Sequence, residues 1–420
     1  KETLLKKPYY GREHRMNKTE AAKAFLEIAA QLKREGLLAE TAGIVKAALR
    51  GENGEVFLAE LGGAETTIQE RAASDEGEPM LSAFSARPDA TTVLLLGGVY
   101  APGVANTKKY LVAELDDMAQ IVGLTARVAR SLTKAEIARC LKGRNSCFVN
   151  GLGMLITGRS TAEAVTGAIL LEKAAMTHEL AKKIGGARRV PLFSAALMHL
   201  VYQKKYSKIN LEEETKRSVH PPEPADAEQP ERSAREQALR EQIVAYGMRL
   251  TNEGVLQGTW GNLAVRLDET YMLTTPSGLD YRRLTPDDIV KVELATLGYG
   301  NQRKPTSEKR MHRDLFAARA DVGACIHTHA KLCGVFAAAR RSVCCISGEM
   351  KALVGEEMRC AGHALPSTKK LSKVALRALG NRNGCLLMNH GAICCGADLE
   401  RAYLTCKAAE QAAGEQLGVL

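Results

Sequence analysis

Two histidines one residue apart are the first feature of this chain that could carry chemistry. His327 and His329 lie in the apolar run Val322–Ala330, and such a run predicts a buried strand. Successive side chains on a strand alternate between its faces, so both imidazoles point to the same side. Imidazoles that converge from a rigid strand are ligands that zinc and similar divalent ions take in proteins. The spacing therefore predicts part of a metal site.

Two further residues stand where they could complete that site. Glu308 precedes a predicted helix upstream, and His390 lies downstream in Met388-Asn-His-Gly391. Three histidines would leave an open metal position for substrate oxygens, and a nearby carboxylate could take a proton from the carbon beside a polarised carbonyl. Two alternatives stay open: the histidines as hydrogen-bonded core residues, and Glu308 as a first-turn glutamate favoured by the helix dipole. His312 is a spare histidine on the same helix.

Three short polar segments predict an anion site beside the metal. Their glycines allow close approach of backbone donors, and their hydroxyl and amide groups can hydrogen-bond phosphate oxygens. Each segment alone is typical of an ordinary turn. The candidates are Gly261, Asn262, Thr275, Ser277, Gly278, Thr306 and Ser307. The chain contains neither a Walker-type phosphate loop nor a dinucleotide fingerprint, and no serine-triad signal.

A segment rich in proline and charge divides the chain into two similar halves. It predicts an extended linker at 207–234, between a domain at 1–206 and another at 235–420. Capping-box patterns at 17–20 and 233–236 predict the start of a helix in each half. The second helix carries an apolar stripe. Its members are Leu239, Ile243, Tyr246 and Leu250.

The two halves align as a tandem duplication. Residues 34–43 match 252–261, 80–93 match 311–324, and 147–153 match 385–391. In this alignment the polar site residues of the second half meet apolar residues or glycine in the first. Leu96, Gly98, Leu152 and Ile44 stand opposite His327, His329, His390 and Asn262. We therefore expect the first half to keep the fold without the site.

Composition excludes several classes of function. The net charge of +10 is spread along the chain without a basic patch interleaved with aromatic residues, so no nucleic-acid partner is expected. No apolar run reaches the roughly 18 residues of a membrane span, and the start at 1–7 lacks the apolar core of a signal peptide. The eleven cysteines form no CxxC pair, which is typical of reduced thiols in the cytoplasm.

The second half resembles the class II aldolase/adducin family from about Arg235 to Gly418. The resemblance rests on Gly258-Thr-Trp-Gly-Asn-Leu263, Thr275-Pro-Ser-Gly278, Ser307-Glu308, His327-Thr-His329 and Asn389-His-Gly391. The first half looks like a degenerate copy. The resemblance implies an α/β fold: two tandem α/β/α sandwiches, each around a mostly antiparallel sheet.

The resemblance also implies roles for the site residues. A zinc ion, or another divalent ion such as Mn²⁺ or Co²⁺, would bind His327, His329 and His390. Glu308 would act as the base, and the polar segments would hold the substrate phosphate. Family aldolases often carry a tyrosine proton donor in a Pro-Tyr-Ala segment. Here His363 takes that place. It could be the proton donor, it could mark different chemistry, or it could be only a surface loop residue.

The implied activity is that of a lyase. A metal-dependent aldolase would cleave or form a carbon–carbon bond in a phosphorylated ketose through an enediolate. A sugar-phosphate 4-epimerase or another lyase on the same metal frame is the nearest alternative, and a non-catalytic adducin-like scaffold is the third. Family members are usually tetramers with active sites between subunits, which implies a homo-oligomer, either a dimer of tandem chains or larger. The only other partner expected is the small phosphorylated sugar.

Overall fold

The chain folds into two compact units that do not coincide with the two halves of the sequence. The computed structural model describes residues 16–38, 45–63, 67–72, 78–206 and 232–420. By its internal contacts, the first unit holds the described residues up to 110 and residues 126–172. The second unit combines residues 111–125 with the described residues from 173 to 420. Most of the predicted linker at 207–234 lies outside the described residues, and the domain limits 206 and 235 stay a prediction.

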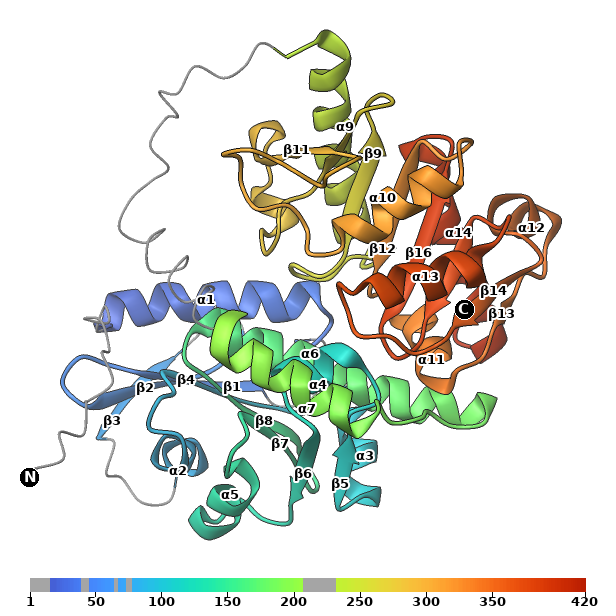
Figure 1. Ribbon diagram of the computed structural model, residues 1–420. Helices are drawn as coiled ribbons and strands as arrows, with labels where there is room; N and C mark the ends of the chain where they lie inside the picture. The colour runs from blue at the N-terminus through green and yellow to red at the C-terminus, as the bar shows by residue number, and fades with distance from the viewer. Residues whose placement is uncertain (1–15, 39–44, 64–66, 73–77, 207–231) are drawn as a thin grey trace, which may run out of the picture. The chain divides into compact units, whose positions relative to one another are not determined.

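The described residues contain two eight-stranded sheets with the same strand order (Figure 1). The first runs β3-β2-β1-β4-β8-β7-β6-β5, and the second runs β11-β10-β9-β12-β16-β15-β14-β13. The first sheet contains β1 Val45–Arg50, β2 Glu55–Glu60, β3 Ile68–Ala72, β4 Thr92–Leu96, β5 Tyr110–Val112, β6 Thr125–Ala129, β7 Ser146–Val149 and β8 Gly153–Gly158. The second contains β9 Asn262–Arg266, β10 Tyr271–Thr274, β11 Val290–Glu293, β12 Ala324–Thr328, β13 Val343–Cys344, β14 Glu357–Ala361, β15 Gly384–Leu387 and β16 Gly391–Gly396. The identical order confirms the predicted duplication.

Both sheets are mostly antiparallel, as predicted. In the second, β12 pairs antiparallel with β9 and with β16, whereas β14 and β15 run parallel. In the first, β4 likewise pairs antiparallel with β1 and β8, and β6 and β7 run parallel.

The strand registers correct part of the alignment between the halves. On β12, His327 pairs with Asn262 of β9, and at the same place in the first sheet Leu95 pairs with Lys46. Leu95, rather than Leu96, therefore matches His327, and Lys46, rather than Ile44, matches Asn262. Ile44 itself lies outside the described residues. By the same one-residue shift Gly97, not Gly98, matches His329. The sequence alignment slipped because apolar and small residues are interchangeable there, while the hydrogen-bonded ladder is not.

Helices cover both faces of the second sheet, which confirms the predicted sandwich (Figure 1). The helices α10 and α13 pack on one face, and α11 and α14 pack on the other. Neighbouring cysteines of β16 show the two faces: Cys395 joins the core under α10 and α13, whereas Cys394 meets Cys406 of α14. The second unit contains α4 Asp116–Ile121, the end of α6 Thr161–Ala181, α7 Leu192–Val201, α9 Ala234–Asn252, α10 Lys309–Ala318, α11 Lys331–Ala339, α12 Gly348–Val354, α13 Lys369–Leu379 and α14 Leu399–Leu417. The first contains α1 Lys18–Arg34, α2 Pro79–Ala86, α3 Ala101–Thr107, α5 Lys134–Leu141 and the start of α6. Short turns of helix occur at η2 Lys182–Ile184, η3 Tyr202–Tyr206, η4 Tyr281–Arg283 and η5 Pro286–Asp288.

The predicted helix starts are present in both halves. Asn17 caps α1 with a complete capping box, because Glu20 bonds back to its backbone N–H. Ser233 caps α9 by accepting the N–H of Glu236, whose carboxylate turns instead to Arg240. Of the predicted stripe on α9, Ile243 and Leu250 are buried, while Leu239 and Tyr246 are half-buried.

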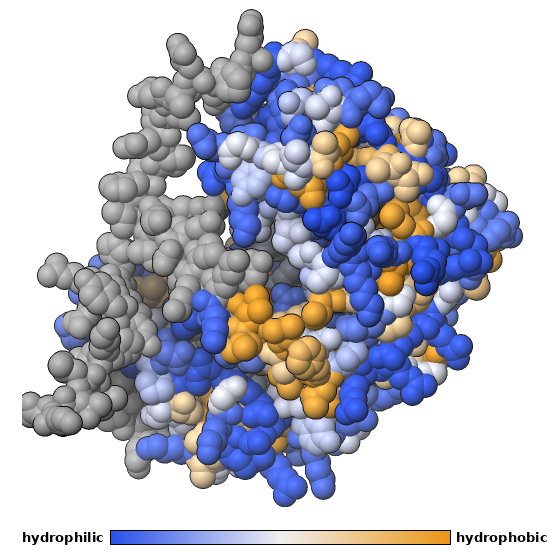
Figure 2. Space-filling view, in the orientation of Figure 1, coloured by the Kyte–Doolittle hydropathy of each residue, from blue (hydrophilic) through white to orange (hydrophobic). Residues whose placement is uncertain are grey.

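One helix of the second unit exposes apolar side chains. In Figure 2 an apolar area of the surface lies over α7. The exposed members on and beside this helix are Leu192, Phe193, Leu200 and Val201, and Phe193 is 78% exposed. No helix among the described residues is long and apolar enough to cross a membrane.

Candidate metal centre

The structure brings the three predicted histidine ligands together in the second unit. Their ring centroids lie 4.8–4.9 Å apart, and one ring nitrogen from each lies within 4.8 Å of the others. His327 is on β12, His329 follows that strand, and His390 precedes β16. All three are buried. Among the described residues this is the one group of histidine, cysteine or acidic side chains with metal-binding geometry.

Hydrogen bonding sets the orientation of His327. Its Nδ1–H donates to the carbonyl oxygen of Ala392 at 2.8 Å, so Nε2 carries the free lone pair. Nε2 is buried without a hydrogen-bond partner and lies 3.1 Å from Oε2 of Glu308. Gly391 makes this approach of β16 to β12 possible, because an added Cβ would stand 2.2 Å from the carbonyl oxygen of Thr328. A buried, unpartnered imidazole nitrogen fits a metal ligand.

Asn389 fixes the backbone that presents His390. Its φ of 60° lies in the left-handed region, which asparagine tolerates better than most residues. Its side-chain amide donates to the carbonyl oxygens of Glu114 at 2.8 Å and Arg188 at 2.7 Å. Its own carbonyl accepts the N–H of Asp116 at 2.7 Å. Residue 389 is therefore held on several sides.

Glu308 lies beside the histidines at the N-cap position of α10. Its Oε1 is 3.8 Å from Nε2 of His390 and has no hydrogen-bond partner among the described residues. The Asn262 amide donates to Oε2 at 3.3 Å. Burial alone would raise the pKa of Glu308, but His327, His390 and Asn262 outweigh it and lower this pKa. Glu308 is therefore an ionised carboxylate with one oxygen available.

His312 supports this carboxylate indirectly. Its Nε2–H donates to the side-chain oxygen of Asn262, and its Nδ1 accepts from the thiol of Cys325 at 2.8 Å. His312 does not belong to the group of converging ligand nitrogens. The spare histidine thus orients Asn262, which in turn orients Glu308.

Burial keeps His329 and His390 neutral. It lowers the pKa of His329 to about 4 and the pKa of His390 to about 3. Neutral imidazole is the form that binds a metal ion.

Two of the predicted anion segments lie side by side. The N–H of Thr306 donates to the carbonyl of Thr275 at 3.0 Å, and the N–H of Ser277 donates to that of Lys304 at 2.9 Å. Thr275 and Thr306 are buried, whereas Ser307 and Gly278 are exposed. Gly261 and Asn262 approach from β9, where a Cβ on Gly261 would stand 2.6 Å from the carbonyl oxygen of His327. All the candidates therefore lie in the second unit, on segments joined to β9, β12 or the start of α10.

The family model for the class II aldolase and adducin N-terminal domain matches residues 26–178 and again 241–417. The chain belongs to this family. The 5-methylthioribulose-1-phosphate/5-deoxyribulose-1-phosphate aldolase of Rhodospirillum rubrum is 39% identical over 165 residues, covering 39% of this chain and 74% of that protein. The L-fuculose phosphate aldolase of Escherichia coli is 36% identical over 167 residues, covering 39% of this chain and 75% of that protein. A solved L-fuculose 1-phosphate aldolase shares 31% identity with a TM-score of 0.41, covering 44% of this chain and 85% of that one.

Sequence reasoning missed two acidic residues and a lysine that approach the histidines of this class II aldolase family member. Asp117 Oδ2 lies 3.6 Å from Nδ1 of His329, and Asp116 Oδ2 lies 3.9 Å from Nδ1 of His390. Lys173 pairs with Asp117 at 2.8 Å and also donates to the carbonyl of His329 at 2.8 Å. Charged residues inside the apolar runs 110–122 and 168–176 were the available signal. All three residues belong to the first half of the sequence, which was expected to keep the fold without the site, and they lie in the second unit beside the histidines.

The two aspartates differ in their electrostatics. Burial raises the pKa of Asp116, and the negative charges of Asp117 and Glu308 raise it further. Burial acts in the same direction on Asp117, but Lys173 and His329 outweigh it and hold this pKa well below its usual range. Asp117 is therefore the charged member of the pair.

His363, the predicted proton donor, lies in the loop after β14. Its Nε2 contacts Oγ of Ser194 on α7 at 3.0 Å, and it is only partly buried. It is not part of the group of converging histidine nitrogens.

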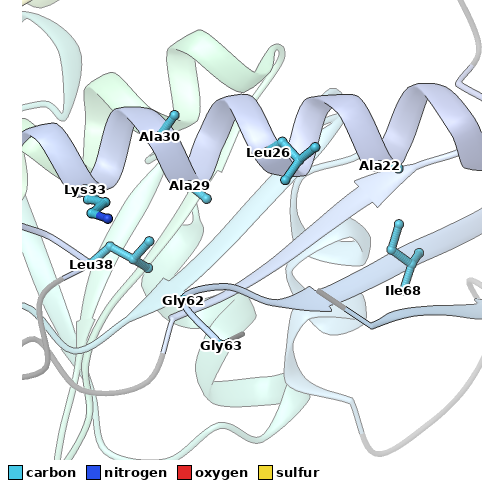
Figure 3. A pocket seen from close by; sticks show the side chains of 9 residues that line it. All are labelled: Ala22, Leu26, Ala29, Ala30, Lys33, Leu38, Gly62, Gly63 and Ile68. Atoms are coloured by element: carbon cyan, nitrogen blue, oxygen red, sulfur yellow. The ribbon is translucent and has the colours of Figure 1, made fainter. Parts of the chain in front are cut away.

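A groove in the first unit carries no such chemistry. It has a volume of about 520 Å³ and lies between α1 and the sheet (Figure 3). Its lining is Ala22, Leu26, Ala29, Ala30, Lys33, Leu38, Gly62, Gly63 and Ile68. One lysine in an otherwise apolar and glycine lining offers neither a metal site nor an acid–base pair.

Proposed function

We propose that this chain is a metal-dependent class II aldolase, which cleaves or forms a carbon–carbon bond in a phosphorylated ketose through an enediolate. The observation that carries the proposal is the buried Glu308 carboxylate, which lies beside three converging histidines. The aldolase names of the relatives support the same reaction class.

His327, His329 and His390 would hold the ion, with Zn²⁺ first among the candidates and Mn²⁺ or Co²⁺ as alternatives. Such an ion polarises the substrate carbonyl and stabilises negative charge on its oxygen. Glu308 is the base in this proposal. Its unpartnered Oε1 accepts the proton from the carbon next to the carbonyl, while Asn262 holds Oε2 in place.

The polar segments at 261–262, 275–278 and 306–307 are the proposed phosphate site. The backbone pairing of Thr275 with Thr306 supports it, because it holds two of these segments at one place. Hydroxyl groups and glycine-rich backbone would bind the phosphate oxygens and fix the distance from the phosphate to the reacting carbon. A small phosphorylated sugar is the substrate that this arrangement suits.

His363 is the proposed proton donor to the aldehyde oxygen. Its Nδ1 is buried and without a hydrogen-bond partner among the described residues. Burial lowers the pKa of His363, and Lys370 and Arg340 lower it further. Because this donor acts on the aldehyde oxygen, His363→Gln should slow the full aldol reaction without slowing proton exchange at the donor carbon. Equal loss of both would assign His363 to folding or binding instead.

We also propose that the protein is a cytoplasmic homo-oligomer. The eleven cysteines are all free, which suits a reducing compartment. The exposed apolar side chains of α7 suit burial against another copy. Light scattering that gave the mass of a single chain would overturn the oligomer.

The test of the aldolase proposal is deuterium exchange into dihydroxyacetone phosphate in heavy water, followed by NMR. This experiment isolates proton transfer at the donor carbon and needs no knowledge of the aldehyde. We expect the zinc-loaded protein to exchange one proton stereospecifically. A chelator, His327→Ala and Glu308→Gln should each abolish the exchange. Glu349→Gln is the matched control, because Glu349 is likewise a glutamate at the start of a helix but is exposed and is not a candidate site residue.

The other outcomes separate the alternatives. A zinc-loaded protein that exchanges nothing would exclude this donor and favour a 4-epimerase or another lyase reaction. A protein that neither binds zinc nor exchanges would be an adducin-like scaffold. Exchange that persists in Glu308→Gln would remove Glu308 as the base while keeping the aldolase reaction.

A further inference from the structure

We infer that Asp116 and Asp117, together with Lys173, form an outer layer that positions the metal ligands, although these residues belong to the half of the sequence that lacks the histidines. This inference rests on the proposed metal centre and assigns it residues that neither the family motifs nor the spacing of the histidines predicts. All three lie in the second unit with His329 and His390.

His329 and His390 each turn a ring nitrogen toward one of the aspartates. Nε2 of His327 and Nε2 of His390 both face Glu308, at 3.1 and 3.8 Å. Nδ1 of His390 therefore points away from that carboxylate, and it faces Asp116. His329 presents its Nδ1 to Asp117 in the same manner. Metal-binding histidines characteristically direct their second ring nitrogen at a carboxylate or carbonyl, which fixes the tautomer and the orientation of the ring.

The atoms that face each other across this contact are buried, and most of them have no hydrogen-bond partner among the described residues. Asp116 is fully buried, and neither of its carboxylate oxygens has a hydrogen-bond partner among the described residues. Nδ1 of His329 and Nδ1 of His390 are likewise buried and unpartnered. Buried polar atoms are rarely left in this state. Asp116 Oδ2 and Nδ1 of His390 face each other at 3.9 Å and are each other's available partners. Nδ1 of His329 has Asp117 Oδ2 at 3.6 Å as its available acceptor, although that oxygen also binds Lys173.

The aspartates of this outer layer are distinct from the candidate metal ligands. Neither aspartate belongs to the group of ligand atoms that lie within 4.8 Å of one another, which contains only the three histidines. The aspartates thus stand behind the imidazoles rather than among the ligand nitrogens. They act through His329 and His390, so we regard them as positioning residues.

Lys173 offsets the negative charge of the buried Asp117 carboxylate. Lys173 is buried, and its ammonium lies between the Asp117 carboxylate and the carbonyl of His329, at 2.8 Å from each. Since a buried charge without a partner is strongly unfavourable, Lys173 keeps Asp117 ionised and, in the same contact, holds the backbone of a metal ligand.

The test measures Co²⁺ binding to the full-length chain, by competition with a chromophoric chelator and by the visible absorption spectrum of the bound ion. Asp117→Ala and Asp116→Ala should each weaken Co²⁺ affinity by about 10–100-fold, the effect usual for partners of metal ligands. Asp117→Asn, which keeps an oxygen facing Nδ1, should recover part of the affinity. A shift of the absorption bands in the alanine variants would report a changed ligand geometry, which a loss of fold stability alone does not produce.

Glu114→Gln is the matched control. Glu114 lies in the same segment and is also buried, and its side chain pairs with His178, which is outside the site. The substitution keeps the backbone carbonyl of residue 114, which is the atom that accepts from Asn389. The Co²⁺ affinity of the Glu114→Gln variant should match that of the wild type. Fluorescence of Trp260, the single tryptophan, checks that each variant is folded.

Two results would overturn the inference, and they are distinguishable. A wild type that binds Co²⁺ while both alanine variants bind it within twofold, with unchanged spectra, would refute the outer layer and leave the proposed function intact. A folded wild type that binds no Co²⁺ would refute the metal centre itself, and the outer layer with it.

Discussion

Asn389 gives a sharp quantitative test of how the candidate metal centre is held. Its side-chain amide makes two hydrogen bonds, to the carbonyls of Glu114 and Arg188, and its φ is 60°. The matching residue of the first copy is Gly151, with a φ of 75°. Both copies therefore have the left-handed conformation here. The second anchors it with the residue's own side chain, whereas in the first the N–H of Gly151 donates to Oδ1 of Asn106 at 3.0 Å.

The magnitudes follow from these contacts. Removing the amide loses the hydrogen bond to the Arg188 carbonyl, which contributes about 1 kcal/mol. The carbonyl of Glu114, a residue only 4% exposed, loses its donor in a dry environment, and such an unsatisfied group costs about 1–3 kcal/mol. We expect Asn389→Gly to lower the free energy of unfolding of the second unit by about 2–4 kcal/mol. Asn389→Ala should lower it by about 1 kcal/mol more, because alanine resists the left-handed region and glycine does not.

The assay is guanidinium unfolding followed by fluorescence. Trp260 is the only tryptophan of the chain and lies in the second unit, so its signal follows that unit separately from the first. Asn301→Ala, a change at an exposed asparagine of the same unit, is the control and should stay within about 0.5 kcal/mol of the wild type. Wild-type stability in Asn389→Gly would refute the anchoring role of the amide. An alanine variant as stable as the glycine variant would refute the backbone argument.

Three further predictions concern the site. Gly391→Ala should weaken Zn²⁺ binding more than tenfold in a chelator competition, because its Cβ would stand 2.2 Å from the carbonyl oxygen of Thr328; Gly348→Ala, with open space around its Cβ, should not. Saturating Zn²⁺ at about 100 times its Kd should stabilise the metal-free protein by about 2.7 kcal/mol in the Trp260 assay, and a chelator should reverse the gain. His312 and His390 have pKa values of about 3 in the folded protein, so the unfolded chain binds more protons below about pH 6.5. Metal-free stability should therefore fall as pH decreases from about 6.5 towards 4, by about 1.4 kcal/mol per pH unit for each histidine, and a flat urea midpoint over that range would contradict this.

The sequence predicted those features that depend on local pattern. The apolar run around His327 predicted β12, which is buried at every position. Alternation along a strand then required His327 and His329 to share a face, and the structure has them on one face. The helix starts at Asn17 and Ser233 were predictable for the same reason, because a cap is an interaction within four residues.

Features that depend on long-range pairing were not predictable in this way. The sequence alignment placed Leu96, rather than Leu95, opposite His327, because a row of apolar residues does not show which one faces the site. Asn262 was predicted as a phosphate ligand, a role that stays a prediction. Its contacts to Glu308 and His312 depend on residues 46 and 50 positions further along the chain. No spacing rule connects such residues, since only the folded sheet and helix bring them together.

The acidic pair shows why a copy that lost its ligands can still be constrained by the site. Opposite His327 and His390 the first copy carries Leu95 and Leu152, which are compatible with the fold and with the absence of a metal. Asp116 and Asp117 are under a different constraint. Replacing them with apolar residues of similar size would leave the second ring nitrogens of His329 and His390 facing apolar atoms. An N–H at these buried nitrogens would then have no acceptor. This would disfavour the tautomer that presents the other ring nitrogen to an ion. Loss of the histidines from one copy and retention of buried acids in its neighbouring segment are therefore expected together if the duplicated chain serves a single metal centre.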